Sequence, residues 1–94
     1  MLFEWDQSKA ATNKRKHKVS FELAQLAMET DQTQLSRYDR TVDDEDRWHT
    51  LAGIENVILI ISHTYRENDH GEEVIRIISA RKATTGEKAA YYER

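Results

Sequence analysis

The sequence predicts an α+β fold: an antiparallel β-sheet of three to four strands, with two helices before it and one after it. Three observations lead to this fold class. Two helix start signals come early in the chain, several strand-like runs joined by turn-forming residues follow, and a capping box near the end begins a last helix. We expect positions 1–94 to form a single domain, because so small a core cannot be divided and still offset the entropy of the chain.

The N-terminal third is predicted to contain two helices. Asp6 is suited to cap a first helix that runs to about His17. This helix is polar almost throughout, so Phe3 and Trp5, in a short extended segment before it, are expected to anchor it to the core. Ser20 caps a second helix, whose apolar residues recur at helical spacing and should lie across the sheet. These residues are Phe21, Ala24, Leu26, Ala27 and Met28.

The rest of the chain alternates between strands and turns. The expected strands cover residues 35–40 (an edge strand), 47–51, 57–66 and 74–81. Residues 57–61 are apolar on both faces, which indicates a central strand of a sheet covered on both sides. Thr84 with Glu87 predicts the capping box of the final helix.

The composition points to a protein of the cytoplasm. The chain has no cysteine, which excludes disulfides, thiolate metal sites and cysteine nucleophiles and suits a reducing compartment. Its first residues do not resemble an export signal, and its longest apolar run, 57–61, is far too short to span a bilayer. We therefore expect a cytoplasmic protein that does not bind a membrane.

Charge is distributed unevenly along the chain, although its sum is only −3. An acidic run occupies positions 43–46, and a basic segment lies on either side of it. The first segment contains Lys9, Lys14, Arg15, Lys16 and Lys18, and the second contains Arg76, Arg81, Lys82, Lys88 and Arg94. A local anion site can therefore exist on an acidic chain, and Lys16 and Lys82 are candidates for binding the phosphates of RNA. The first segment could equally be a solvated helix face.

Three arginines of one expected hairpin favour the chemistry of RNA cleavage. RNA can be cut without a metal when its 2′-hydroxyl attacks the adjacent phosphate, which requires a base, a proton donor and cations around the developing charge. Arg66, Arg76 and Arg81 suit the last role, because a planar, permanently charged guanidinium matches phosphate oxygens. His63 is a candidate base. The alternative is that the arginines pair with surface carboxylates and that the histidine is structural.

The register of this hairpin decides which of these residues share a face. If the hairpin turn is centred between Asp69 and His70, His63 lies opposite Arg76. A slip of one residue places Arg66 on the face of Arg76 instead, and the sequence does not choose between the two registers. Arg76 and Arg81 differ in parity, so they act together only if the strand ends or bulges near residues 79–80.

Metal catalysis is the rival chemistry, and the acidic run at 43–46 is the densest source of carboxylates. Neighbouring residues of a strand point to opposite faces and cannot all bind one ion, and the histidines show no ligand spacing. The chain also has no glycine-rich phosphate loop. We therefore expect neither a metal nor another cofactor.

Three groups of residues, taken in order, carry a resemblance to a known family. The opening group is Phe3-Glu4-Trp5-Asp6, Lys9, Asn13, Lys16-His17, Val19-Ser20-Phe21 and Ala24. The middle group is Arg47 and Gly53, and the closing group is Arg76-Ile77-Ile78-Ser79-Ala80-Arg81-Lys82-Ala83, Glu87 and Tyr91. In this order they resemble the BrnT family of bacterial toxins. Two features depart from that family: Lys18 stands where it usually has glycine, and residues 31–46 match little.

The resemblance implies a compact RelE-like fold and a ribonuclease that arrests translation. It also implies neutralisation by a BrnA-like antitoxin, in a heterotetramer of two toxins and two antitoxins that binds operator DNA through the antitoxin. In similar toxins, cations on the sheet and residues of the last helix surround the scissile phosphate. By that resemblance Arg76 and Arg81 clamp the phosphate, and Tyr91 transfers a proton or stacks on a base. Arg66 and His63 are further candidates, the latter as the alternative base.

Two other functions fit parts of the sequence. A non-catalytic module, or an inactive relative of the toxins, would use the same basic patches to bind a partner protein or nucleic acid. A DNA-binding repressor would need a helix-turn-helix with a basic recognition helix, and none is apparent between Asp6 and Thr30. Expression in a bacterial host separates the toxin from the module, because only an active ribonuclease is expected to stop growth and leave cleaved RNA.

Overall fold

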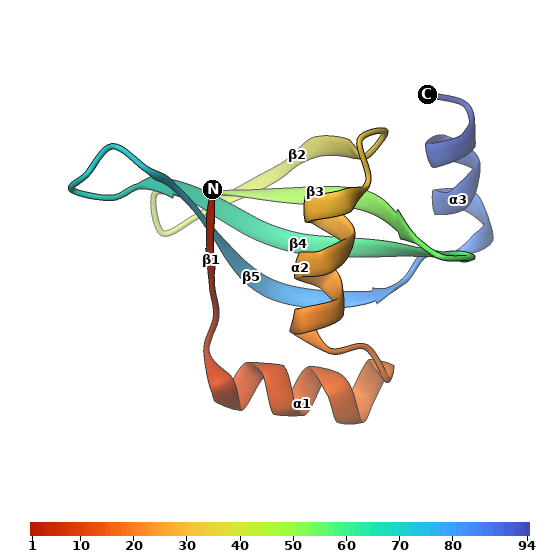
Figure 1. Cartoon of the computed structure of the whole chain (residues 1–94), viewed down its shortest axis with the longest axis horizontal. Coiled ribbons are helices and arrows are strands. Elements are labelled where there is room, and N and C mark those ends of the chain that lie inside the picture. Colours follow the sequence, from red (N-terminus) through yellow and green to blue (C-terminus); the bar gives the residue numbers. More distant parts are fainter.

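The computed structural model describes residues 1–94 as three helices and one five-stranded sheet (Figure 1). The helices are α1 (Gln7–His17), α2 (Phe21–Thr30) and α3 (Thr85–Tyr92). The strands are β1 (Leu2–Glu4), β2 (Leu35–Val42), β3 (Glu45–Ile54), β4 (Val57–Glu67) and β5 (Glu73–Lys82), in the spatial order β1-β5-β4-β3-β2. The α+β class and the three helices are confirmed.

The prediction of three to four antiparallel strands is wrong, because a fifth strand makes the sheet mixed. The segment before α1 forms β1, which pairs in parallel with β5 and places Phe3 beside Ile75 and Glu4 beside Arg76. At three residues, β1 is too short for alternation of apolar residues to distinguish it from an extended connection. Its predicted anchoring role is confirmed, since Phe3 and Trp5 pack against the main core.

All three helices begin at the predicted caps. The Asp6 carboxylate accepts from the backbone N–H of Lys9 at 3.1 Å, and the Ser20 hydroxyl accepts from that of Leu23 at 3.0 Å. The capping box of α3 is present in full, because Thr84 and Glu87 each accept a hydrogen bond from the backbone N–H of the other. Short polar side chains at these positions satisfy first-turn N–H groups that have no partner inside the helix.

One face of the sheet is covered by α2, and we call it the helix face. Figure 1 shows α2 lying across the strands, with α1 below the sheet. Phe21, Ala24 and Ala27 of α2 are fully buried in a core that includes Leu59 and Ile61 of β4. Leu26, which the predicted apolar stripe included, is instead exposed, so that part of the prediction is wrong.

The outer edge of β5 is closed by a side chain of α1. β1 pairs with β5 only as far as Arg76, so the backbone groups beyond it need other partners. Asn13 supplies them for Ala80: its side chain donates to the Ala80 carbonyl at 2.7 Å and accepts from the Ala80 N–H at 3.1 Å. This buried amide fixes α1 along the β5 edge.

The opposite face of the sheet, which we call the open face, is covered by α3 alone. Leu51, Ile58 and Ile60 form a second, smaller core there with Ala83 and Tyr91. Figure 1 shows α3 near one end of the strands, so most of the open face has no helix over it. The predicted edge strand is confirmed and extended as β2, and the acidic run begins in the tight turn between β2 and β3.

Candidate functional site

The structure settles which hairpin register is formed. Thr64 lies opposite Arg76 and Arg66 opposite Val74, so Arg66 and Arg76 share the open face. The register with His63 opposite Arg76 is wrong, because His63 lies opposite Ile77 on the helix face. The turn between β4 and β5 is centred on His70 and not between Asp69 and His70, which shifts the register by one residue. Its Asn68 side chain accepts from the backbone N–H groups of two later turn residues.

A bulge in β5 brings Arg81 to the same face as Arg76. Ser62 pairs with Ser79 and His63 with Ile77, which leaves Ile78 as an extra residue without an opposite partner. The extra residue reverses the parity of the strand, so that Arg81, opposite Ile60, faces the same side as Arg76. The bulge that the sequence required for Arg76 and Arg81 to act together is therefore present.

Further cationic residues of the open face come from β2 and β3. Arg37 lies opposite His49, and His49 lies opposite Ser62. Arg47, two residues before His49, is on the same face. Arg37, Arg47 and His49 were not among the site residues predicted from the sequence. The available signal was that Arg47, His49 and Leu51 alternate along one strand and so point to the same side of the sheet. Which side that is can be told only when the order of the strands is known.

Glu4 holds two arginines of the open face. One Glu4 carboxylate oxygen accepts from Arg66 Nε at 2.9 Å and Nη2 at 2.6 Å, and the other lies 3.7 Å from Arg76 Nη1. Strand β1 places Glu4 there through its parallel pairing beside Arg76. The contact orients Arg66 closely, whereas Arg76 keeps most of its donors free for an anion.

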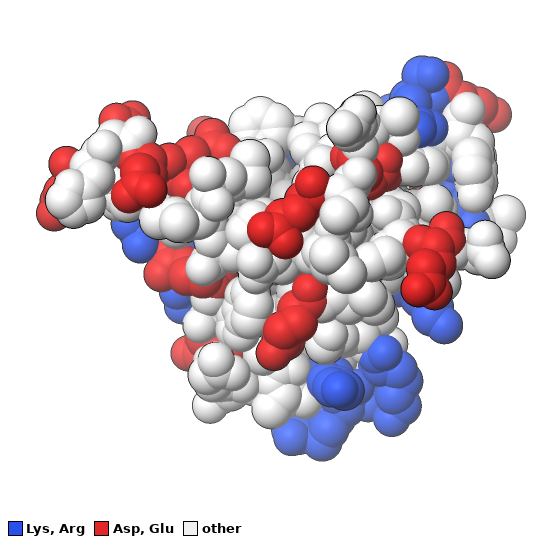
Figure 2. All heavy atoms as spheres, viewed as in Figure 1, with Lys and Arg blue, Asp and Glu red and all other residues white.

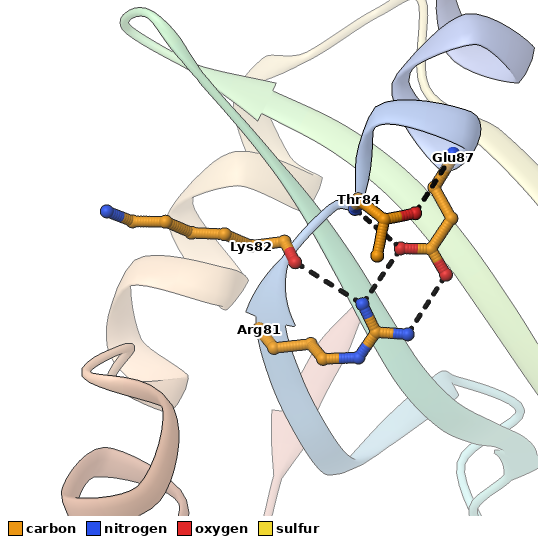
Figure 3. Close-up of polar contacts among 4 residues, drawn as sticks. All are labelled: Arg81, Lys82, Thr84 and Glu87. Carbon is orange, nitrogen blue, oxygen red and sulfur yellow. Dashed lines mark hydrogen bonds and ion pairs between the residues drawn. The ribbon is translucent and has the colours of Figure 1, made fainter.

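Arg81 forms a two-pronged ion pair with Glu87 of α3 (Figure 3). Its two terminal nitrogens lie 2.8 and 2.9 Å from the two carboxylate oxygens. The hydrogen bonds from Arg81 lower the pKa of Glu87 to about 2, and those to Glu87 raise the pKa of Arg81. Figure 3 shows the Lys82 side chain pointing away from this pair, and Lys82 lies opposite Leu59 on the helix face. Arg81 and Lys82 therefore do not share a site.

Tyr91 lies on the buried side of α3, in the small core between this helix and the open face. Its side chain is only 7% exposed, and its hydroxyl donates to an Asp31 carboxylate oxygen at 2.6 Å. The bond to Asp31 raises the pKa of Tyr91. Gly53 packs closely there, since a Cβ at this position would lie 3.1 Å from the Tyr91 hydroxyl. Tyr91 thus fastens α3 to β3 and to the end of α2.

His63 is fully buried on the helix face. Its Nε2 is 2.6 Å from the hydroxyl of Thr50, which in turn is 2.7 Å from that of Ser36. Desolvation by burial lowers the pKa of His63 to about 4, so the ring is neutral near pH 7. The sheet backbone separates it from Arg76.

The basic residues of α1 adjoin the open face through β5. A hollow of about 310 Å³ lies between α1 and β5 and is lined by Ser8, Lys9, Thr12, Asn13, Lys16, His17, Ile78 and Ser79. Figure 2 shows Lys and Arg atoms gathered over the C-terminal part of α1. Lys16 therefore lies beside the bulged end of β5, close in the fold to the strand that carries Arg76 and Arg81.

A second hollow, of about 260 Å³, lies on the open face where α3 meets β2 and β3. Its lining includes Arg37, His49 and Glu87, together with apolar residues that support them. Asp39 holds the ring of His49, with 3.4 Å between Asp39 Oδ2 and His49 Nε2. The hollow thus combines a cation and an imidazole with the carboxylate that orients Arg81.

No group of three or more His, Asp or Glu side chains lies close enough together to hold a metal ion. No helix of the chain is long and apolar enough to cross a membrane.

The fold and the site define a small α+β protein with a cationic sheet face suited to an anionic polymer. A family model described as ribonuclease toxin, BrnT, of type II toxin-antitoxin system matches residues 5–87. The chain belongs to this family, so it is a ribonuclease toxin of a type II toxin-antitoxin system and has a protein antitoxin as its partner. No curated protein matches the chain.

Proposed function

We propose that this toxin cleaves RNA on its open face without a metal, by attack of the 2′-hydroxyl on the adjacent phosphate, and that cleavage inhibits translation. The toxin acts in the cytoplasm as one domain with a RelE-like fold. A BrnA-like antitoxin holds it in a heterotetramer of two toxins and two antitoxins, which reaches operator DNA only through the antitoxin. The observation that carries the site is the bulge in β5, which brings Arg81 to the face that Arg66 and Arg76 already share.

The arginines bind the phosphate and stabilise the charge that develops on it. Arg76 is the main ligand, because its single contact with Glu4 is long at 3.7 Å and leaves donors free. Arg66 and Arg81 are held in place by Glu4 and Glu87, so their remaining N–H groups are fixed before the substrate arrives. Fixed donors around a developing charge lower the barrier without reorganising during the reaction.

Proton transfer is assigned to His49. An imidazole can take and return a proton near neutral pH, and His49 lies in the centre of the open face between Arg37 and Ser62. The other candidates are placed less well. Glu87, with a pKa of about 2, is a weak base. His63 is buried on the helix face, so we assign it a structural role, and Tyr91 acts by positioning α3.

The RNA backbone continues from the open face across the bulge to α1. The hollow between α1 and β5 joins Ser79 to Lys9 and Lys16, and none of the ion pairs in the structure involves these lysines. Unpaired cations beside the site can therefore neutralise flanking phosphates. Lys82 lies on the other face, and its contribution to RNA binding would come only from long-range attraction.

Cleavage of RNA by purified variants tests this assignment. Arg76→Ala should lower the cleavage rate by 100-fold or more, on the order expected for loss of a donor to a transition-state charge. His49→Gln should lower it about as strongly, since general acid–base catalysis contributes roughly 100-fold or more. Lys88→Ala removes an exposed cation of α3 and is the matched control, with unchanged cleavage expected. Full activity of Arg76→Ala would refute the proposed site.

A non-catalytic binding module is the second candidate, because Arg66 and Arg81 already have carboxylate partners. Such pairs are common on surfaces that carry no chemistry. A module predicts that purified wild-type protein retains RNA on a filter but leaves it intact.

A further inference from the structure

Three aromatic side chains form a continuous row on the helix face. Tyr38, Trp48 and Tyr65 come from the neighbouring strands β2, β3 and β4, and we call this row the aromatic stripe. The ring centres of Tyr38 and Trp48 are 5.8 Å apart, and those of Trp48 and Tyr65 are 5.9 Å apart. Both pairs meet edge to face, a favourable arrangement for aromatic rings.

The stripe is part of the helix face but no helix covers it. Figure 1 shows the β2–β3 and β4–β5 hairpins extending well beyond α2. Tyr38 is 53% exposed and Tyr65 is 37% exposed. Contiguous exposed aromatic surface of this kind is typical of interaction sites, whereas single exposed apolar residues are common everywhere.

Carboxylates stand at both ends of the stripe. At one end the Tyr38 hydroxyl is 2.7 Å from the hydroxyl of Thr41, which donates to Asp46 at 2.6 Å. At the other end Tyr65 lines a shallow hollow with Arg66, Glu67 and Glu73. The Arg66 side chain is turned to the open face, where it pairs with Glu4, so the two carboxylates are the charged groups on the side of the stripe. The register places Asp46, Glu67 and Glu73 on the helix face, because each is an even number of residues from a member of the stripe or from its cross-strand partner.

The charge around the stripe selects the kind of partner. Figure 2 shows Asp and Glu atoms gathered at the end of the molecule formed by the two hairpins. These carboxylates would repel the phosphates of RNA, although aromatic rings alone could stack on bases. They would attract a peptide that carries lysine or arginine beside its apolar residues. The stripe is therefore suited to a basic, amphipathic protein segment.

We infer that the aromatic stripe is the docking surface for the antitoxin, through a segment with large apolar side chains packed on Trp48 and with Lys or Arg side chains facing Asp46 and Glu73. This inference rests on the antitoxin partnership and adds to it the surface and the chemistry of contact. The open face and the stripe lie on opposite sides of the sheet. Changes in the stripe should consequently weaken antitoxin binding and leave RNA cleavage intact.

Titration of the cognate antitoxin against purified toxin variants tests the inference. Tyr38→Ser, at the most exposed position of the stripe, should weaken binding tenfold or more, as expected for a large aromatic side chain that packs in an interface. Glu73→Lys should weaken it several-fold at low salt and less at high salt. Tyr92→Ser is the matched control, because Tyr92 is an exposed tyrosine on α3, outside the stripe. It should bind as tightly as the wild type.

Fluorescence of Trp48 supplies a second, direct readout. In a Trp5→Phe background Trp48 is the only tryptophan, so its emission reports on the stripe alone. Antitoxin should shift this emission to shorter wavelength, and a single-stranded RNA of twelve nucleotides should not. A shift with RNA and none with antitoxin would overturn the inference in favour of a base-stacking surface.

The remaining outcomes separate this inference from the proposed function. Unchanged antitoxin affinity in both Tyr38→Ser and Glu73→Lys overturns the docking surface and leaves the partnership standing. Absence of binding to the wild type overturns the partnership and the docking surface together. RNA cleavage by the same preparations tests the open face separately in either case.

Discussion

Replacing Asp31 with Asn should destabilise the toxin, because this carboxylate joins the end of α2 to α3 and β3. It accepts from the backbone N–H groups of Gly53 at 2.8 Å and of Thr33 at 2.9 Å, and from the hydroxyls of Thr33 at 2.7 Å and Tyr91 at 2.6 Å. All four partners are donors. An amide at this position turns one of its two ends into a competing donor, so part of the network is lost.

The size of the effect follows from the pKa of Asp31. Desolvation by burial acts to raise it, but the hydrogen bonds from Gly53, Tyr91 and Thr33 outweigh burial and lower the pKa from 3.8 to about 2. A shift of nearly two pKa units corresponds to about 2 kcal/mol of the free energy of unfolding. Because the folded pKa is the lower one, this stability is present above pH 3.8 and is lost as the pH falls toward 2.

Urea unfolding followed by tryptophan fluorescence measures the effect. Asp31→Asn should lose about 2 kcal/mol at pH 7 and at pH 5, and the difference from the wild type should be smaller at pH 3. Asp69→Asn, exposed in the β4–β5 turn, is the matched control and should unfold with the wild type. An Asp31→Asn variant with the wild-type urea midpoint at pH 7 would refute the reasoning, as would a difference that does not shrink at pH 3.

Three further predictions concern stability. Lys18→Gly should raise the free energy of unfolding by roughly 1 kcal/mol in urea, because Lys18 ends α1 with a φ of 63°, a conformation that favours glycine. Glu87→Gln should lower it by about 1 kcal/mol at pH 7 after allowance for the partial exposure of the Arg81 pair, and should raise the KM for RNA more than a control Glu93→Gln does. In the wild type, the free energy of unfolding should fall as the pH drops from 6.5 toward 4. Over this range His63 binds a proton in the unfolded chain, whereas the buried ring of the folded protein, with a pKa of about 4, does not. His63→Gln should lose up to about 3 kcal/mol of this dependence, and an unchanged pH profile would contradict the buried neutral ring.

Local signals in the sequence were sufficient to predict the helices and most of the strands. Asp6, Ser20 and Thr84 act through hydrogen bonds to the first turn, so their effect depends on a few neighbouring residues. The expectation of a glycine at position 18 also has a local reason, since the backbone of Lys18 is left-handed. Strand β1 could not be predicted in this way, because its formation depends on parallel pairing with a strand about seventy residues later.

The candidate site depended on features that local patterns do not determine. The cooperation of Arg76 and Arg81 requires the bulge at Ile78, and the sequence could state that condition but not decide it. His63 and His49 lie on opposite faces, and only the register of three strands reveals which of them faces the arginines. Tyr91 matched the family block, yet its hydroxyl is committed to Asp31.

The most direct test of metal-independent cleavage on the open face is to analyse the ends of RNA cut by the purified toxin in excess chelator. The same RNA with a single 2′-deoxynucleotide at the cleaved position serves as the second substrate. Attack by the 2′-hydroxyl predicts a 2′,3′-cyclic phosphate on the product, no cleavage of the deoxy substrate, and at least a 100-fold loss in Arg76→Ala. Cleavage that chelator abolishes, or that proceeds at the 2′-deoxynucleotide, would contradict the mechanism.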